Sequence, residues 1–180
     1  MNDLRYPIGK YNTGAADPIS PEQIAAAIES IAALPAQLRK ETAAMTEDQL
    51  DTPYRDGGWT VRQTVHHVAD SHINSYIRFR LALTEDEPTI KPYDEKAWAE
   101  LADARSADVN VSLTLIDSIH ERWVMLLRSM APDDFKRPFL HPENGVRRLD
   151  WNTLLYAWHG KHHLAHIAGL RERMGWSTRA

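Results

Sequence analysis

The sequence contains no cysteine among its 180 residues. Disulfides, thiolate metal ligands and a cysteine nucleophile are therefore excluded. It also has no run of about 18 apolar residues that could cross a membrane, and its first residues lack the apolar stretch of a secretory signal. The formal net charge of -4 provides no basic surface of the kind that nucleic-acid binders carry. These absences predict a cytoplasmic protein that binds neither nucleic acid nor membrane.

The remaining composition is typical of a globular protein. The hydrophobic fraction is 43% and the charged fraction is 26%, and a chain of this length can bury most of its apolar surface in one core. We therefore expect residues 1–180 to form a single domain. Two residue types are abundant, since there are nine histidines and six tryptophans. Four of the histidines lie close together, at His159, His162, His163 and His166.

Two capping boxes mark the starts of long helices. Ser20 can cap a helix that has proline at its first position and Gln23 closing the box. Thr60 and Gln63 repeat this arrangement before a second apolar-periodic segment. Pro35 lies inside the first helix and predicts a kink or a restart there.

Apolar spacing predicts an all-α protein, and no segment alternates convincingly as a strand. The long helices are expected at about 21–44, 61–83, 108–130 and 151–174. Asp150 is the expected cap of the last helix, and Gly175 is well placed to end it. Residues 1–19 lack periodicity and are expected to form an arm on the surface, while 94–101 can form a short helix. Together these features predict a four-helix bundle with an N-terminal arm and short extra helices in the connections.

A weak internal repeat fits this architecture. Residues 45–54 parallel residues 130–139, and each copy follows a long helix. Each copy also precedes a tryptophan, Trp59 or Trp151, and then a histidine-bearing helix. Two helix-turn-helix halves related by approximate symmetry would build such a bundle.

The four clustered histidines fall on one face of the last helix. At about 100° per residue they lie within about 100° of one another, on the face expected to meet the other helices. Buried histidines need hydrogen-bond partners or remain neutral, and neutral imidazole is a good metal ligand. Two pairs lie one turn apart, His159 with His163 and His162 with His166. Spacing does not choose between these pairs.

Other helices offer further ligands. The second helix carries His66, His67 and His72, and the third carries His120. By helical angle His72 faces the core most directly, with His67 towards the flank. A site of three histidines would leave coordination positions open for water or substrate, as catalytic sites do. Zinc, nickel or another late divalent metal would suit nitrogen ligands.

Five stretches of the chain resemble the YfiT-like branch of the DinB superfamily. They are residues 6–9, 50–63, 66–72, 93–98 and 158–167. The long loop motif from Leu50 to Gln63 is the most specific of them. The resemblance implies a four-helix bundle whose metal is held by three histidines. These are His67 from the second helix and the pair His159 and His163 from the fourth.

The resemblance also implies an activity. Members of this branch are described as metal-dependent hydrolases, and related members are thiol transferases, including bacillithiol S-transferases. An enzyme of this kind would use one divalent ion per subunit, zinc or nickel, to activate water or a low-molecular-weight thiol towards a small-molecule substrate. Homodimers are common among such proteins. One departure is Gly160-Lys161, where relatives often carry polar residues or histidine, and it leaves the implied ligands intact.

Several residues are candidates for supporting roles. Those that could act as acid, base or outer-shell partner are Asp70, His72, Asn74 and His120. The loop residues Tyr54, Arg55 and Asp56 either shape a substrate pocket or form a tight turn anchored by Trp59. No His-Glu-x-x-His motif is present, so peptide hydrolysis of that type is not expected. The alternatives to an enzyme are a non-catalytic metal-binding or sensing module and a dimerisation scaffold with a polar histidine core.

Overall fold

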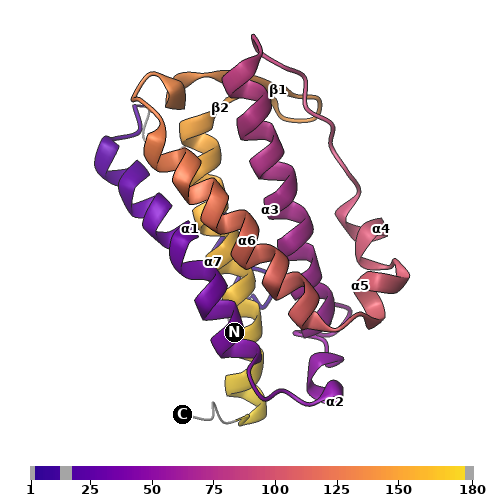
Figure 1. Ribbon diagram of the computed structural model, residues 1–180. Helices are drawn as coiled ribbons and strands as arrows, with labels where there is room; N and C mark the ends of the chain where they lie inside the picture. The colour runs from indigo at the N-terminus through magenta and orange to yellow at the C-terminus, as the bar shows by residue number, and fades with distance from the viewer. Residues whose placement is uncertain (1–2, 13–17, 177–180) are drawn as a thin grey trace.

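The computed structural model describes residues 3–12 and 18–176. Its four long helices, which form a bundle (Figure 1), are α1 (Pro21–Thr42), α3 (Val61–Thr84), α6 (Val109–Ser129) and α7 (Leu149–Met174). Helices α1 and α3 each pack against both α6 and α7. The expected all-α bundle is therefore confirmed. Within the described residues, no helix is both long and apolar enough to cross a membrane.

Three of the predicted capping residues form the expected hydrogen bonds and set the helix ends where expected. The Ser20 hydroxyl accepts a hydrogen bond from the Gln23 backbone N–H at 3.3 Å, and Thr60 accepts one from Gln63 at 3.1 Å. In both boxes the glutamine side chain accepts a hydrogen bond from the backbone N–H of the cap residue. Gly175 ends α7 in the left-handed conformation, with φ of 65°. These local signals therefore set three of the helix ends without help from the rest of the fold.

Asp150 is not the cap of α7, contrary to expectation. The helix begins at Leu149 and its cap is Arg148. Asp150 is instead buried in the first turn, where its carboxylate pairs with the Arg148 guanidinium at 2.8 Å. A carboxylate in the first turn still favours the positive end of the helix dipole.

The connections contain a hairpin that the sequence analysis did not predict. Strands β1 (Pro138–His141) and β2 (Gly145–Arg148) pair antiparallel, and Phe139 is buried between them and the bundle. The backbone N–H of Ile90 also donates to the Leu140 carbonyl at 3.0 Å. Strands of four residues are too short to show alternation, and distant backbone pairing stabilises them.

The other connecting elements are short helices. They are α2 (Glu47–Leu50), α4 (Glu95–Ala99), α5 (Ala102–Ser106) and the 3-10 turn η1 (Asp134–Lys136). Helix α4 falls inside the expected segment 94–101. The two copies of the repeat both form a helical turn followed by a β-bridge, Pro53 with Thr60 in the first and Pro138 with Arg148 in the second. Of the expected N-terminal arm, Tyr11 packs on α7 against Trp151, while residues 13–17 lie outside the described part.

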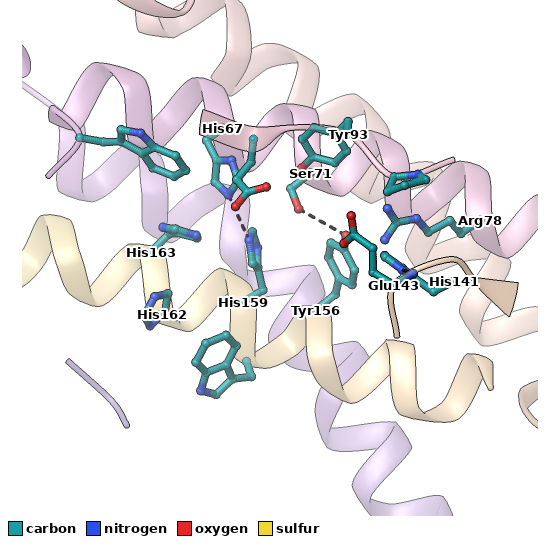
Figure 2. Close-up of a pocket in the computed structure, with 14 residues that line it drawn as sticks. His67, Ser71, Arg78, Tyr93, His141, Glu143, Tyr156, His159, His162 and His163 are labelled. Carbon is teal, nitrogen blue, oxygen red and sulfur yellow. Dashed lines mark hydrogen bonds between the residues drawn. The ribbon is translucent and has the colours of Figure 1, made fainter. Parts of the chain in front are cut away.

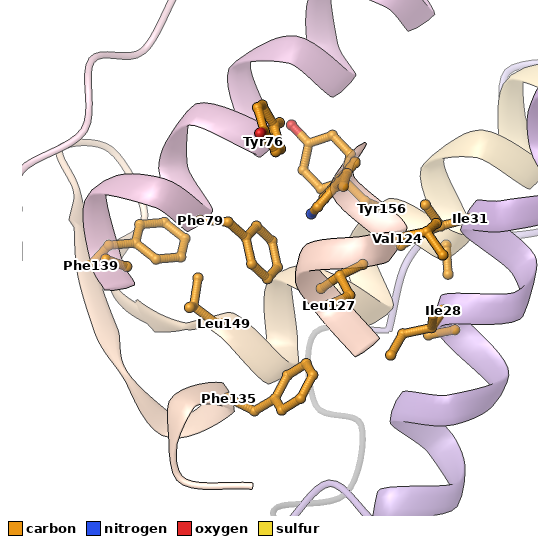
Figure 3. Close-up of a cluster of buried hydrophobic side chains, with 14 of the residues drawn as sticks. Ile28, Ile31, Tyr76, Phe79, Val124, Leu127, Phe135, Phe139, Leu149 and Tyr156 are labelled. Atoms are coloured by element: carbon orange, nitrogen blue, oxygen red, sulfur yellow. The ribbon is translucent and has the colours of Figure 1, made fainter. Parts of the chain in front are cut away.

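Apolar side chains from all four helices fill the bundle. Figure 3 shows one buried cluster, which includes Phe79, Leu127 and Leu149. Helices α1 and α7 approach closely at Gly160, where a Cβ atom would lie 2.5 Å from the Leu34 side chain. Buried between the helices are also His72 and His120, each at most 2% exposed. The core therefore carries polar groups that must find partners inside it.

Candidate metal centre

Three histidines converge where α3 faces α7 (Figure 2). His67 projects from α3, and His159 and His163 project from successive turns of α7. One ring nitrogen from each lies within 4.8 Å of the other two. The Nε2 atoms of His67 and His159 are 3.3 Å apart. We refer to His67, His159 and His163 as the histidine triplet.

The triplet fits a divalent metal ion in both geometry and protonation. Nitrogen ligands at about 2.0–2.1 Å from a tetrahedral zinc ion are separated by about 3.3 Å, the spacing seen between His67 and His159. Burial lowers the pKa of His67 to about 4 and holds the pKa values of His159 and His163 well below the ordinary value. The rings are therefore neutral near pH 7, which is the form that binds a metal.

A chain of hydrogen bonds orients one member of the triplet. His159 Nδ1 lies 3.2 Å from His72 Nε2, and His72 Nδ1 lies 2.9 Å from His120 Nε2. His120 Nδ1 lies 2.7 Å from the carbonyl oxygen of Ile31. Because a carbonyl only accepts, His120 Nδ1 carries the proton. In neutral rings each Nδ1–H then donates to the next Nε2, so Nε2 of His159 is left with a free lone pair that faces the triplet.

The start of this chain traces back to Pro35. Helix α1 continues through that residue as one helix, so the expected restart does not occur. Proline has no N–H to give the carbonyl four residues earlier, which is that of Ile31. The His120 ring supplies the missing donor. The proline thus creates the acceptor that sets the proton positions in the histidine chain.

A second group of histidines also has metal-ligand spacing. Nitrogens of His162, His163 and His166 lie within 4.8 Å of one another, and all three rings are buried. His166 stacks on Tyr54 at a centroid distance of 4.0 Å, and its Nε2 lies 3.3 Å from the Arg5 carbonyl oxygen. Ligand spacing by itself therefore leaves two groups that share His163, just as helical spacing in the sequence left two pairs.

A pocket of about 370 Å³ connects the triplet to solvent. Its aromatic walls are formed by Trp59, Tyr93, Tyr156 and Trp158. His67, His159, His162 and His163 line one part of it, and His166 does not line it. The Ser71 hydroxyl, on the same face of α3 as His67, donates to the Tyr156 hydroxyl at 3.3 Å (Figure 2). The pocket gives a small molecule access to the triplet.

The structure separates the four candidate supporting residues. His72 and His120 belong to the hydrogen-bonded chain, one and two steps from His159. Asp70 and Asn74 do not line the pocket. The Asn74 amide donates to the Asp70 carbonyl at 2.8 Å, and burial raises the pKa of Asp70 to about 6. The first two therefore connect to the triplet through hydrogen bonds, whereas the other two are not part of the pocket lining.

The loop before α3 forms the tight turn that was one of its two expected roles. The Tyr54 N–H donates to the Trp59 carbonyl at 3.0 Å, and Gly57 has a φ of 61°. The Trp59 ring lies 4.6 Å from that of His67 and lines the pocket. Tyr54 and Arg55 line a separate, adjacent hollow. The turn therefore contributes to the site through its tryptophan.

Several pocket residues were not identified from the sequence. Ser71 and Arg78 lie four and eleven residues after His67, so helical spacing could have placed all three on one face of α3. His141 and Glu143 come from the hairpin that was not predicted. Glu95 and Tyr93 come from the connection after α3. Only the folded chain brings these connections to the pocket.

Acidification is expected to destabilise the metal-free protein. Burial lowers the pKa of His120 from 6.5 to about 4, so below pH 6.5 the unfolded chain binds a proton that the folded chain does not. Stability is then lost as the pH falls from about 6.5 to about 4, by about 1.4 kcal/mol per pH unit for each such histidine. Urea unfolding at about pH 7.5 and about pH 5.5 measures this loss, and His120→Phe should reduce its slope. Equal stability at both values would contradict the prediction.

Comparisons with known proteins identify a family, similar sequences and a similar fold. The DinB superfamily pattern matches residues 30–167. A Bacillus cereus (strain B4264) protein named "Putative metal-dependent hydrolase" is 56% identical over 176 residues, 98% of this chain and 100% of that protein. A protein of the same description from Bacillus thuringiensis subsp. konkukian (strain 97-27) is 55% identical over 176 residues, with the same coverage of both chains. The solved structure of YfiT from Bacillus subtilis, described as "a probable metal-dependent hydrolase with an unusual four-helix bundle topology", matches with a TM-score of 0.93 and 53% identity, over 97% of this chain and 99% of that one.

Proposed function

The chain belongs to the DinB superfamily, and from this membership we propose that it is a metal-dependent hydrolase whose ion is held by His67, His159 and His163. The observation that carries the proposal is the convergence of three ring nitrogens within 4.8 Å of one another beside an open pocket, with His159 Nε2 3.3 Å from His67 Nε2. Among the described residues, the metal-binding group around His67 contains three side chains. Three protein ligands leave a position for water or substrate, which favours catalysis over a sensing module or scaffold.

The second histidine group supports this choice of ligands. His166 does not line the pocket, and its Nε2 is directed at the Arg5 carbonyl. Two members of this group line the pocket, but His166 lies outside it, whereas all three members of the triplet line it. His163 is shared by the two groups, so the proposal assigns it to the triplet and assigns His162 and His166 to aromatic packing against Trp158 and Tyr54.

The remaining pocket residues provide proton transfer and substrate contacts. When bound, a divalent ion supplies Lewis acidity and lowers the pKa of coordinated water towards neutrality. Glu95 is a pocket carboxylate that also lines the hollow beside Trp59, and the Trp59 ring lies 4.6 Å from His67. We therefore place Glu95 at the histidine end as the group that accepts the proton of the attacking water. The hydroxyls of Ser71 and Tyr156 offer hydrogen bonds to the substrate further along the pocket.

Replacing Glu95 with glutamine is expected to lower kcat by about a hundredfold, since general-base catalysis contributes roughly that factor or more. Metal content should be unchanged, because Glu95 is not one of the three ligands. The measurement is turnover of an ester and amide panel by the metal-loaded variant and wild type. Glu100→Gln, in the same connection but away from the pocket, is the matched control. Full activity of Glu95→Gln would contradict the assignment.

Thiol transfer is the second candidate at the same site. The chain has no cysteine of its own, so a low-molecular-weight thiol such as bacillithiol would enter as a cosubstrate. The aromatic pocket of about 370 Å³ can accommodate such a molecule. The deciding experiment runs low-molecular-weight thiols with electrophiles beside the ester and amide panel, with metal-loaded and metal-stripped protein. Turnover only with thiols would replace hydrolysis as the reaction.

Three finer properties belong to the same proposal. Zinc or nickel is the proposed ion, because three imidazole nitrogens suit late divalent metals. A homodimer is proposed, and exposed apolar residues Val111, Leu115 and Met125 lie on one side of α6 where a second chain can pack. A cytoplasmic location is proposed from the sequence. Metal analysis of the protein as purified and light scattering in solution test the first two.

A further inference from the structure

The pocket has a second end, marked by Arg78. His67, Ser71 and Arg78 lie on one strip of α3, at positions i, i+4 and i+11, and all three line the pocket. Eleven residues of helix separate His67 and Arg78 by about 16 Å along the axis. Figure 2 shows Arg78 beside the hairpin residues His141 and Glu143, at the opposite end from His163. A bound molecule can therefore contact the triplet with one end and Arg78 with the other.

Most of the Arg78 side chain is shielded from solvent, and no protein group pairs with it among the described residues. It is 9% exposed, and among the described residues it has neither a hydrogen bond nor an ion pair. The other arginine of α3 that is buried, Arg62, pairs with Asp51 at 2.7 Å and donates to the Ala107 carbonyl at 2.9 Å. No nitrogen of Arg78 is among the fully buried polar atoms that lack a partner, so its guanidinium opens onto the pocket, where a ligand can reach it.

The residues beside Arg78 present hydrogen-bond donors. The Glu143 backbone N–H donates to His141 Nδ1 at 3.2 Å. Partial burial and the charge of Arg78 lower the pKa of His141, which keeps the ring neutral. Its proton is therefore on Nε2, available to a ligand. The Tyr93 hydroxyl lines the same pocket, and burial raises its pKa, so it also retains its proton.

The charges that line the pocket argue against a ligand that carries more than one negative charge. Arg78 is the only arginine or lysine among the described residues that line the pocket, and Glu95 and Glu143 add negative charge. A planar carboxylate matches a guanidinium through two parallel hydrogen bonds. A phosphate dianion would bring twice the charge to a single cation. We propose that Arg78, with His141 and Tyr93, forms a subsite for a carboxylate group on the substrate, at the far end of the pocket from the histidine triplet.

The proposed subsite depends on the proposed metal centre, so we choose a ligand that tests the subsite and the metal centre together. Mercaptohexanoate carries a thiol for the metal and a carboxylate for Arg78, and mercaptohexanol differs only in lacking the charge. Both are titrated into cobalt-loaded protein, where thiol binding changes the visible spectrum. The carboxylate should strengthen binding about tenfold, as expected for one charge-assisted contact. Arg78→Gln should abolish the difference between the two thiols.

Matched variants separate a subsite from a general charge effect. Arg80→Gln removes the same charge from an exposed position of α3 and should preserve the tenfold preference. Glu143→Gln removes a competing negative charge and should increase it. If Arg78→Gln does not load cobalt, Arg78→Lys retains the charge without the planar fork and should reduce the preference. Equal binding of the two thiols to wild type, or equal loss in Arg78→Gln and Arg80→Gln, would overturn the subsite.

Two further outcomes remain decisive. If inorganic phosphate displaces mercaptohexanoate better than acetate does, the assignment to a carboxylate is wrong. If neither thiol changes the cobalt spectrum, the proposal that the histidine triplet holds a metal open to thiols is contradicted. Calorimetry of hexanoate with metal-free wild type and Arg78→Gln then tests the subsite alone, since only wild type should bind. Absence of any difference between those two proteins would overturn it.

Discussion

Replacing His163 with alanine is expected to abolish tight metal binding and all activity. The variant keeps only His67 and His159 as ligands, and two imidazoles do not hold a late divalent ion in a protein pocket as three do. The loss should exceed the roughly ten- to hundredfold drop in metal affinity that follows removal of an outer-shell partner. Metal content of the purified variant and its activity on the ester and amide panel measure both effects.

His162→Ala is the matched control, because it removes a neighbouring buried imidazole on the same helix. It should cost packing against Trp158, whose ring lies 4.5 Å away in a stacked arrangement, but leave metal content and activity largely intact. Equal metal retention by the two variants would refute the triplet. Loss of metal in both, with retention in His67→Ala, would instead place the ion between His162, His163 and His166.

The second large effect is expected at His72, which touches no substrate. His72→Phe removes the acceptor for His159 Nδ1–H. The His159 ring then loses the hydrogen bond that orients it and that keeps the proton on Nδ1 and away from Nε2. Metal affinity should fall by about ten- to a hundredfold, as it does when such partners are removed elsewhere. Competition with a chromophoric chelator measures the affinity directly.

His72→Gln separates the hydrogen bond from packing. Its amide oxygen can accept the same proton, so part of the affinity should return, whereas a purely structural role of His72 would leave both variants equally impaired. His120→Phe removes a residue one step further along the chain of hydrogen bonds, so it should also lower metal affinity, but by less. If His72→Phe binds metal as wild type does, the hydrogen-bonded chain does not set the ligand.

Much of the bundle was predictable because its signals are local. Each helix-capping signal acts within one helical turn, as at Ser20, Thr60 and Gly175. These helix ends can therefore be predicted from neighbouring residues alone. The shared face of the α7 histidines follows from helical geometry in the same way. The hairpin around His141 was missed, since its pairing depends on residues near Ile90 that are distant in sequence.

The sequence by itself determined four long helices, a row of buried histidines and the chemistry those histidines favour. Only the tertiary structure decided how they are used, because the proton on each ring depends on partners from other helices. In the sequence Pro35 predicts a kink or a restart, yet in the fold it frees the Ile31 carbonyl that orients His120, His72 and finally His159. The same applies to Arg78, whose lack of a partner can be seen only when α3, the connections and the hairpin enclose one pocket.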